Sequence, residues 1–352
     1  MTLDPSGLKK GDPTKDLFYA FGGSCLTGEI KQSPKDFRVD EIPGFTPDGN
    51  GDHVYLTLEK KNLTTNDIVN RLVRFCGVKQ RDIGFAGMKD KRAITSQVFS
   101  INLSGKDEPD WSLFESESIS ILDINRHIRK LKRGVLKGNR FNITINNIQG
   151  DTTDLVPILE KIKTQGVPNY FGAQRFGFDG SNLEKSWRLL NGDLKNVKRD
   201  EKSILLSSAR SMIFNAVLNE RVKNGSWNKL LDGEVINLDG TERHFKEPID
   251  DVLLERNQRL DIHATGPLCG LASRALEPSD EANEIERKVL DRYTDWIVGL
   301  KKMKLDHARR ALRIAVKDFQ WVISENKLFL DFTLTSGAYA TVVLRELISD
   351  SC

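Results

Sequence analysis

The sequence of 352 residues has only four cysteines, Cys25, Cys76, Cys269 and Cys352, and they are scattered along the chain. None stands in a CxxC spacing or has a local histidine partner, so neither a structural zinc site nor a disulfide framework is indicated. No segment approaches the roughly 20 apolar residues of a membrane-spanning helix. The first twenty residues carry three lysines and three aspartates without a long apolar run, which does not fit a signal peptide. These absences predict a reduced, cytoplasmic protein without a membrane segment.

Several motifs that define enzyme classes are missing as well. There is no Walker motif, no GxGxxG after a strand and no HxE…PCxxC signature of a zinc deaminase. We therefore expect an enzyme, if this is one, to work with protein side chains alone, without a metal or another cofactor. The histidines are too dispersed to suggest a metal site: His53, His127, His244, His263 and His307.

Length and composition indicate a folded protein with more than one domain. The chain is longer than the usual single domain. Its 38% hydrophobic and 29% charged residues are typical of globular proteins. The 53 Lys and Arg against 50 Asp and Glu give a net charge of +3, which neither demands nor excludes a polyanionic partner. The distribution of charge is therefore more informative than its sum.

Hydrophobic periodicity divides the chain into three parts. Alternation with period two predicts strands near the start and the end, and helical spacing dominates the middle. This order favours a discontinuous domain with an insert, in which the last strands complete the first sheet. The predicted strands are 36–43, 53–60, 98–103, 119–122, 141–145, 319–324 and 328–334, with short ones around 232–240, and the predicted helices are 65–76, 153–164, 182–190, 207–223, 282–302 and 341–348.

Charge is uneven in the first half of the chain. Residues 107–123 hold six acidic side chains, whereas residues 126–140, the basic run, hold seven basic side chains and no acidic one. Such side chains could position nucleic-acid phosphates, although a solvated basic face is the alternative. The basic side chains are Arg126, Arg129, Lys130, Lys132, Arg133, Lys137 and Arg140.

The basic run leads into an aromatic residue, Phe141. Two glycines, Gly134 and Gly138, could let the backbone bend close to a ligand, and Phe141 could stack on a base. Because Phe141 also begins the alternation of a strand, packing in the core is the alternative.

Two further clusters carry functional side chains. Asp90 lies among Lys89, Lys91 and Arg92 in a predicted loop, where nearby cations favour an ionised carboxylate that could act as nucleophile or base, although an ordinary turn aspartate is the alternative. Residues 167–177 combine three aromatics with Asn169, Gln174 and Arg175 between glycines. Arg, Asn, Gln and aromatic side chains recognise splayed RNA bases, and a packed hinge is the alternative.

In this order the clusters resemble the TruD family of tRNA pseudouridine synthases, over about residues 26–347. The similarity departs from the family pattern at Thr335, where the family often has proline, and at Cys269, where it often has tryptophan. The matching segments are Gly28-Glu29-Ile30-Lys31 with residues 34–39, residues 86–95, residues 130–134 with Gly138-Asn139-Arg140-Phe141, residues 167–177, residues 208–215, Thr265-Gly266-Pro267 and residues 336–346.

The resemblance implies an α+β fold. The catalytic domain of pseudouridine synthases, a mixed, mainly antiparallel sheet flanked by helices, would comprise residues 1–165 and 309–352. A TruD-specific α/β domain would be inserted at residues 166–308, with RNA in the cleft between the two. The compact length favours the bacterial type of substrate, uridine at position 13 in the D arm of tRNA. We expect a monomer without an obligate protein partner.

The resemblance also implies roles for individual residues in an isomerase. Asp90 is the catalytic aspartate, Lys31 pairs with it, Phe141 stacks on the target base and Asn139 supports the site. A non-catalytic RNA-binding or RNA-remodelling protein on the same scaffold is the alternative function. The residues expected to contact RNA are Lys89, Arg92, the seven basic side chains of the basic run, Asn169, Phe171, Gln174, Arg175 and Phe176.

Overall fold

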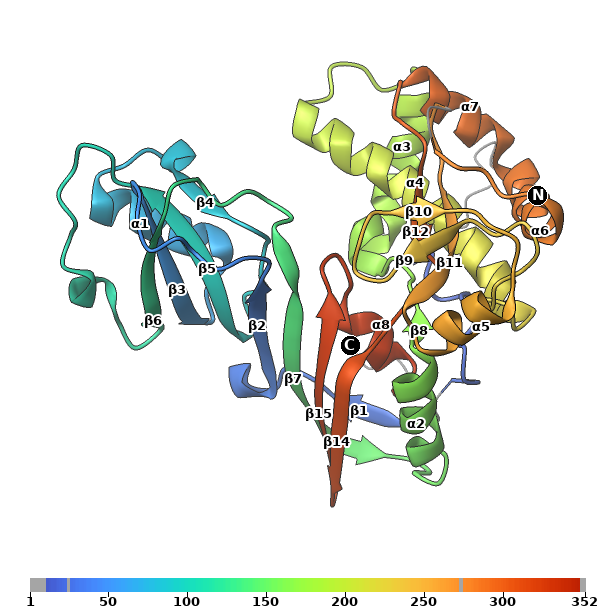
Figure 1. Cartoon of the computed structure of the whole chain (residues 1–352), viewed down its shortest axis with the longest axis horizontal. Coiled ribbons are helices and arrows are strands. Elements are labelled where there is room, and N and C mark those ends of the chain that lie inside the picture. The colour runs from blue at the N-terminus through green and yellow to red at the C-terminus, as the bar shows by residue number, and fades with distance from the viewer. Residues whose placement is uncertain (1–10, 24–25, 272–274, 349–352) are drawn as a thin grey trace. The chain divides into compact units, whose positions relative to one another are not determined.

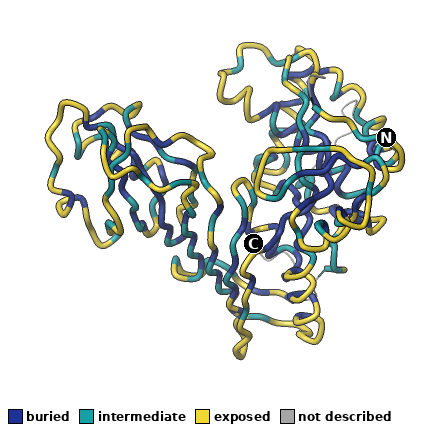
Figure 2. Tube along the Cα trace, in the orientation of Figure 1, coloured by how far each residue is buried: buried dark blue, intermediate teal, exposed yellow. Residues whose placement is uncertain are grey.

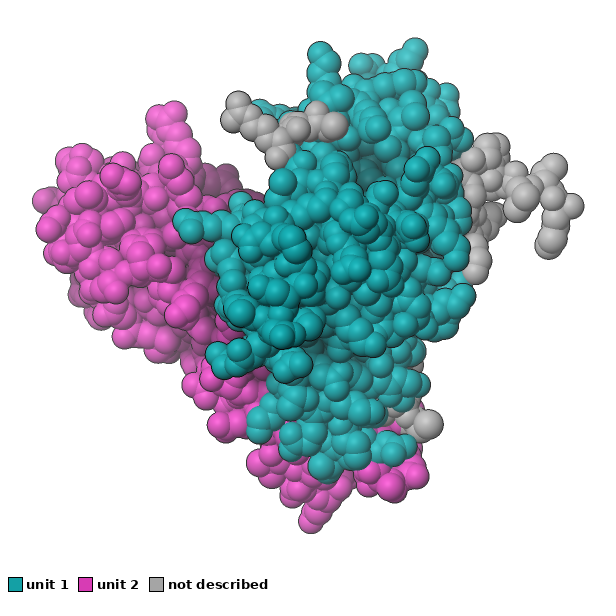
Figure 3. All heavy atoms as spheres, turned by 45° about the vertical axis from the view of Figure 1, so that its right-hand side comes forward, with its two compact units in different colours: residues 1–24, 154–315, 341–347 teal, residues 25–153, 316–340, 348–352 magenta. Residues whose placement is uncertain are grey.

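The computed structural model describes residues 11–23, 26–271 and 275–348. They divide into two compact units, each built from separate stretches of the chain (Figure 3). Unit 1 comprises Met1–Ser24, Asp154–Ala315 and Thr341–Leu347, and unit 2 comprises Cys25–Thr153, Val316–Ala340 and Ile348–Cys352. Cys76 and Cys269 are free thiols, and Cys25 and Cys352 lie outside the described residues. None of the described helices has the length and apolar character needed to cross a membrane.

Unit 2 is built on a mixed sheet of nine strands (Figure 1). Its order is β14-β15-β7-β2-β5-β3-β6, while β1 pairs with β7 and β4 with β5. Only β2 and β5 are parallel among these pairs, so the mainly antiparallel sheet is confirmed, as is its completion by the last two strands. The strands are β1 (Thr27–Glu29), β2 (Phe37–Pro43), β3 (His53–Lys61), β4 (Ile83–Phe85), β5 (Ile94–Asn102), β6 (Ile119–His127), β7 (Leu136–Gln149), β14 (Lys317–Ser324) and β15 (Lys327–Thr335).

Helix α1 (Thr65–Cys76) closes the core of unit 2 against this sheet. Its start is fixed by a capping box between Thr64 and Asp67, and it ends at Gly77 in the left-handed conformation, with φ of 61°. Its apolar face, at Ile68, Val69 and Leu72, packs in one buried cluster with side chains of β3 and β5. The predicted helix 65–76 is therefore confirmed.

Unit 1 surrounds the long helix α4 (Arg199–Lys223), which is buried along most of its length (Figures 1 and 2). Helices α3 and α6 and strand β11 pack against α4. Two sheets, ordered β10-β9-β11-β12 and β13-β8, complete the unit. The other elements are α2 (Leu155–Gln165), β8 (Val167–Pro168), α3 (Ser181–Leu190), β9 (Ile236–Leu238), β10 (His244–Phe245), α5 (Asp251–Gln258), β11 (Ile262–Leu268), α6 (Asp280–Leu290), α7 (Thr294–Lys302), β12 (Ala308–Ala311) and β13 (Arg313–Ile314), and α8 (Ala340–Arg345) crosses the boundary between the units.

The structure differs from the expected elements in several places. The single helix predicted over 282–302 is wrong, because a 3-10 turn at Asp291–Tyr293 and the non-helical Tyr293 separate α6 from α7. Helix α4 begins at Arg199, eight residues before the predicted start at 207. The predicted elements do not include helix α5 or strands β1, β4, β8, β11, β12 and β13. Helix α8 ends at Arg345 rather than at 348.

The boundaries of the units also differ from those expected for the domains. Residues 154–165 and 309–315 group with unit 1, together with the N-terminal stretch and residues 341–347. The assignment of a catalytic domain to 1–165 and 309–352, and of an insert to 166–308, stays a prediction.

Candidate active site

Asp90 lies on the loop of residues 86–93, between β4 and β5 of unit 2. Two fully buried side chains hold this loop. Thr65 Oγ1 accepts a hydrogen bond from the Lys89 amide at 2.9 Å and donates one to Gln97 Oε1 at 3.0 Å. Gln97 Nε2 donates to the carbonyl oxygen of Gly87 at 2.7 Å. The start of α1 and the middle of β5 therefore fix the backbone beside Asp90.

The Asp90 carboxylate forms an ion pair with Lys31. The distance from Lys31 Nζ to Asp90 Oδ2 is 2.7 Å, and the Asp90 side chain remains 51% exposed. Lys31 has a φ of 57°, a left-handed conformation that is uncommon outside glycine and that accompanies many functional sites. Its ammonium group also lies 4.2 Å from the centre of the Phe37 ring. The structure thus brings the predicted pair together and leaves the carboxylate accessible to a ligand.

A second ion pair lies inside the protein beside this loop. Lys89 Nζ is 2.8 Å from Glu41 Oε1 and donates to Asn139 Oδ1 at 2.9 Å, and the two ionic side chains are 8% and 1% exposed. Burial raises the pKa of Glu41, and the Lys89 charge opposes that rise. A buried carboxylate requires its cation inside the protein, which accounts for the position of Lys89, and the expected contact of Lys89 with RNA stays a prediction.

Lys60 completes this charged cluster, and sequence analysis missed it. The residue is 1% exposed, and its Nζ donates to the carbonyl oxygen of Leu63 at 2.5 Å. Burial, aided by the Lys89 charge, lowers the pKa of Lys60 to about 8, while Asp90 and Glu41 oppose the shift. A signal was present, because residue 60 continues the inward alternation of Val54, Leu56 and Leu58 on β3.

Phe141 belongs to a group of aromatic rings in unit 2. Its ring stacks on Phe332 with centroids 5.4 Å apart and meets Phe37 edge-on at 6.4 Å. Phe141 is 6% exposed, so its ring does pack in the core as its strand alternation allows. Since Phe37 also contacts Lys31, the rings are continuous with the Asp90 pair. Stacking of Phe141 on a base stays a prediction.

The basic run is not one uniform surface. Three of its side chains have partners: Arg126 pairs with Glu108, Lys130 Nζ donates to the carbonyl oxygen of Arg81 at 2.6 Å, and Arg140 binds both oxygens of Asp331, at 2.9 and 2.7 Å. Arg133 lies 5.0 Å from the centre of the Phe85 ring. The side chains of Arg92, Arg129, Lys132 and Lys137 are exposed.

The two glycines of this region serve different purposes. Gly134 has a φ of 81° with open space beside its Cα, as a bend near a ligand would require. A Cβ on Gly138 would lie 2.3 Å from the carbonyl oxygen of Leu334. The close approach of strand β15 therefore accounts for Gly138, and its role toward a ligand stays a prediction.

The aromatic segment 167–177 lies in unit 1 and is firmly packed. Asn169 Nδ2 donates to the carbonyl oxygen of Ala311 at 2.7 Å. The main-chain N–H and carbonyl oxygen of Phe171 both bond the Asn215 side chain, at 2.9 Å each. Asn169, Phe171 and Phe176 are buried, whereas Gln174 is exposed and Arg175 is half-buried. Packing therefore accounts for the buried members, and their contact with RNA stays a prediction.

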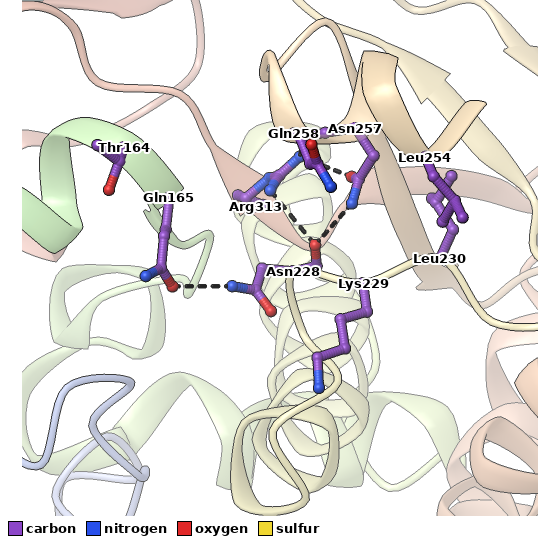
Figure 4. A pocket seen from close by; sticks show the side chains of 9 residues that line it. All are labelled: Thr164, Gln165, Asn228, Lys229, Leu230, Leu254, Asn257, Gln258 and Arg313. Carbon is purple, nitrogen blue, oxygen red and sulfur yellow. Dashed lines mark hydrogen bonds between the residues drawn. The ribbon is translucent and has the colours of Figure 1, made fainter. Parts of the chain in front are cut away.

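A hollow of 440 Å³ in unit 1 contains none of the predicted site residues (Figure 4). Several of its polar groups bond one another: Asn228 Nδ2 donates to Gln165 Oε1 at 3.1 Å, and the Asn228 carbonyl oxygen accepts from Asn257 at 2.9 Å and from Arg313 at 3.3 Å. Within the described ranges, no group of three or more His, Cys, Asp and Glu side chains is placed to hold a metal ion.

Comparisons with known proteins all find the same family. The family described as tRNA pseudouridine synthase D (TruD) matches residues 16–184 and 181–347. A protein named tRNA pseudouridine synthase D from Methylococcus capsulatus is 42% identical over 335 residues, covering 95% of this chain and 94% of the relative. One of the same name from Nitrosococcus oceani is 42% identical over 345 residues, covering 96% of both.

A solved structure shares the fold. The crystal structure of a Methanosarcina mazei protein assigned to tRNA pseudouridine synthase D (TruD) superimposes with a TM-score of 0.71. The alignment covers 94% of this chain and 95% of that protein at 22% sequence identity. It supports the α+β architecture described above.

Proposed function

Because the chain belongs to the tRNA pseudouridine synthase D (TruD) family, we propose that it isomerises uridine to pseudouridine in tRNA, with Asp90 as the catalytic residue. One observation carries the assignment of the residue. Lys31 holds the Asp90 carboxylate at 2.7 Å, and hydrogen bonds from Thr65 and Gln97 hold the loop that carries it. The Asp90 side chain is still 51% exposed, so a ligand can reach it. A carboxylate placed in this way can approach a bound nucleotide without rearrangement of the loop.

In the proposed reaction, each bond that breaks is matched by a bond that forms. The bond between N1 and C1′ breaks, the uracil turns, and a new bond forms between C5 and C1′. The hydrogen on C5 leaves as a proton, and N1 gains a proton. Asp90 acts either as a nucleophile or as the base that removes a proton, and both roles need the carboxylate that Lys31 orients.

The neighbouring groups have separate roles in this proposal. Phe141, with Phe37 and Phe332 behind it, forms an apolar wall that retains the detached uracil during its rotation. Asn139 and Lys89 position the loop through the buried Glu41 carboxylate. Extrusion of the target base costs about a few kcal/mol, which contacts with the RNA backbone offset.

Arg92 and the exposed members of the basic run are the best candidates for those backbone contacts. Arg92, Arg129, Lys132 and Lys137 present their charge to solvent, whereas Arg126 and Arg140 are engaged by carboxylates. We extend the proposal to uridine 13 of the D arm as the target, to a monomeric enzyme and to the cytoplasm as its location, on the strength of the family.

The experiment is incubation of the purified protein with an unmodified tRNA transcript, followed by mapping of pseudouridine along the RNA. We expect product at position 13 with the unchanged protein and none with Asp90→Asn, which should still bind the tRNA. Asp107→Asn, a change at an exposed aspartate outside the candidate site, is the matched control and should be fully active. Product formation by Asp90→Asn would contradict the assignment, and product elsewhere would contradict the position.

A further inference from the structure

Helix α4 carries a segment, residues 208–215, to which the proposed reaction assigns no role. Part of this segment lines a pocket of 280 Å³ within unit 1. The pocket lies where α4 meets Phe171, the end of β11 at Leu268, and Leu305. Its lining comes in two kinds: the apolar side chains are Phe171, Leu206, Leu268 and Leu305, and the polar ones are Ser203, Ser207, Arg210 and Ser211.

Arg210 is a fixed cation at this pocket. Its Nη2 donates to the carbonyl oxygens of Leu268 at 2.7 Å and Asp306 at 2.9 Å, which hold the guanidinium in place. Within the described part of the chain, no carboxylate forms an ion pair with Arg210, and its buried Nε makes no hydrogen bond. Burial lowers the pKa of Arg210, as expected for a charge removed from water without an anion. A rigid guanidinium in this state favours an anionic ligand.

The surroundings of Arg210 add to this preference. The guanidinium groups of Arg310 and Arg175 lie 4.3 and 5.2 Å from the centre of the Phe171 ring, which lines the pocket. Ser207 Oγ accepts from Arg175 Nη1 at 3.1 Å, so its own hydroxyl hydrogen is directed elsewhere and can serve a ligand. No acidic residue lines the pocket. Besides Arg210 in the lining, two further arginines thus contact Phe171, one of the residues that line the pocket.

We propose that this pocket binds one unstacked nucleotide of the RNA, with its phosphate on Arg210 and Ser207 and its sugar and base against Leu206, Leu268 and Leu305. An amphipathic ligand matches a lining that is half apolar and half polar. The volume of 280 Å³ lies just below the roughly 300–1,000 Å³ of pockets for drug-sized ligands, which suits a single nucleotide better than a helix. Single-stranded RNA is recognised in this way. The inference rests on the proposed function for the identity of the RNA.

Two substitutions test the site independently. Arg210→Met keeps the length of the side chain and removes the charge. Ser203→Glu adds a carboxylate at the exposed rim without removing any internal contact, so it remains informative if Arg210→Met folds poorly. Ile204→Glu is the matched control, because it adds the same charge at the next exposed position of α4, outside the pocket lining.

The measurement is the Kd for an unmodified tRNA transcript at several salt concentrations. We expect Arg210→Met to raise Kd about tenfold and to reduce the log–log salt slope by about 0.7–0.9, the loss of one phosphate contact. Ser203→Glu should raise Kd by a similar factor, and Ile204→Glu should leave it unchanged. Under saturating tRNA, Ile204→Glu should form pseudouridine at the normal rate, because residue 204 belongs neither to the pocket lining nor to the loop that carries Asp90.

The outcomes separate this inference from the proposed function. The pocket alone would be overturned by one combination of results. In it, folded Arg210→Met and Ser203→Glu bind tRNA with the Kd and salt slope of the unchanged protein, and the unchanged protein forms pseudouridine normally. Inorganic phosphate and uridine 5′-monophosphate are titrated in parallel. Loss of their binding in Arg210→Met with an unaltered Kd for tRNA would identify a site for free anions and would likewise overturn the proposal. A tRNA that binds through Arg210 but is never modified would overturn only the function.

Discussion

Lys60 shows how a single residue can connect stability with the chemistry of the site. Its ammonium group is 1% exposed and lies in the field of Lys89, Glu41 and Asp90. Keeping this group charged costs free energy, because water is excluded and a second lysine is close. Lys60 is therefore expected to lose its proton at a lower pH than an exposed lysine does.

Replacement of Lys60 by Met should change how stability depends on pH. The folded-state pKa of about 8 lies below the ordinary value of 10.5, so between these values the unfolded chain binds more protons than the folded one. The stability of the unchanged protein therefore rises with pH in this window. Relative to Lys60→Met, it should gain up to about 3 kcal/mol between about pH 7.5 and pH 10.5. Urea unfolding at the two pH values measures this gain.

The adjacent Lys61 provides the control for this prediction. Lys61 is exposed, so Lys61→Met should differ from the unchanged protein by the same amount at both pH values. A constant difference for Lys60→Met as well would show that Lys60 does not titrate in this window.

The loop that carries Asp90 is the structural element on which the site depends. Thr65 begins α1 and bonds both the Lys89 amide and Gln97, and Gln97 bonds Gly87. These hydrogen bonds lie in the interior, where water does not compete for the donors and acceptors. The geometry of the loop is thus set by the packing of α1 against β5 rather than by the loop sequence.

Thr65→Val should weaken this support while preserving the shape of the side chain. Two buried groups lose their partner, which should cost about 1–3 kcal/mol of stability. A displaced carboxylate should lower kcat about ten- to a hundredfold, with KM for tRNA nearly unchanged. Steady-state kinetics and urea unfolding measure the two effects. Thr65→Ser retains the hydroxyl and should restore most of kcat; equal kcat in all three proteins would show that the loop does not need this hydrogen bond.

Elements with complete local signals could be predicted from the sequence, and those shaped by their neighbours could not. Helix α1 has a capping box, an apolar stripe and a terminal glycine, and its predicted bounds agree with the structure. Strand β11 is buried at nearly every position, so it shows no alternation, and its Gly266 and Pro267 are unfavourable in a strand. The break between α6 and α7 likewise has no local breaker in the sequence.

The candidate site could be predicted only in part for a related reason. Lys31 and Asp90 are 59 positions apart, and only the resemblance to a family suggested that they pair. Glu41 and Lys60 occupy inward positions of their strands, yet a charged residue there is normally assigned to the surface. The electrostatic interaction between them depends on the order of strands in the sheet, which local patterns do not specify.

At the scale of the whole chain, the two ends of the described sequence meet in unit 1. Glu346 Oε2 accepts hydrogen bonds from the amides of Ala20 at 3.0 Å and Phe21 at 3.2 Å. Arg345 lies 3.9 Å from the centre of the Tyr19 ring and donates to the carbonyl oxygen of Phe18 at 3.2 Å. Residues near both ends of the chain therefore stabilise the same unit.

Glu346→Gln should reveal the contribution of this junction through pH. Burial raises the pKa of Glu346 from 4.5 to about 7, against the opposing charge of Arg345. The stability associated with the protonated carboxyl is fully present below 4.5 and is lost as the pH rises through about 7. Between about pH 4.5 and pH 8 the unchanged protein should therefore lose up to about 3 kcal/mol relative to Glu346→Gln.

Unfolding in urea at both pH values measures the Glu346 effect. Glu284→Gln, at an exposed position of α6, is the control and should show no such trend. A loss of the same size in the control, or none in Glu346→Gln, would contradict a buried, titrating carboxyl at the junction.

The central claim is that Asp90 drives the exchange of the N1–C1′ bond of uridine for a C5–C1′ bond in tRNA. Since C5 must give up its hydrogen, release of tritium from tRNA labelled at C5 of uridine reports this step directly. The unchanged protein and Asp107→Asn should release tritium in proportion to the pseudouridine formed, and Asp90→Asn should release none while binding the same tRNA. Tritium release by Asp90→Asn at the rate of the unchanged protein would contradict the account.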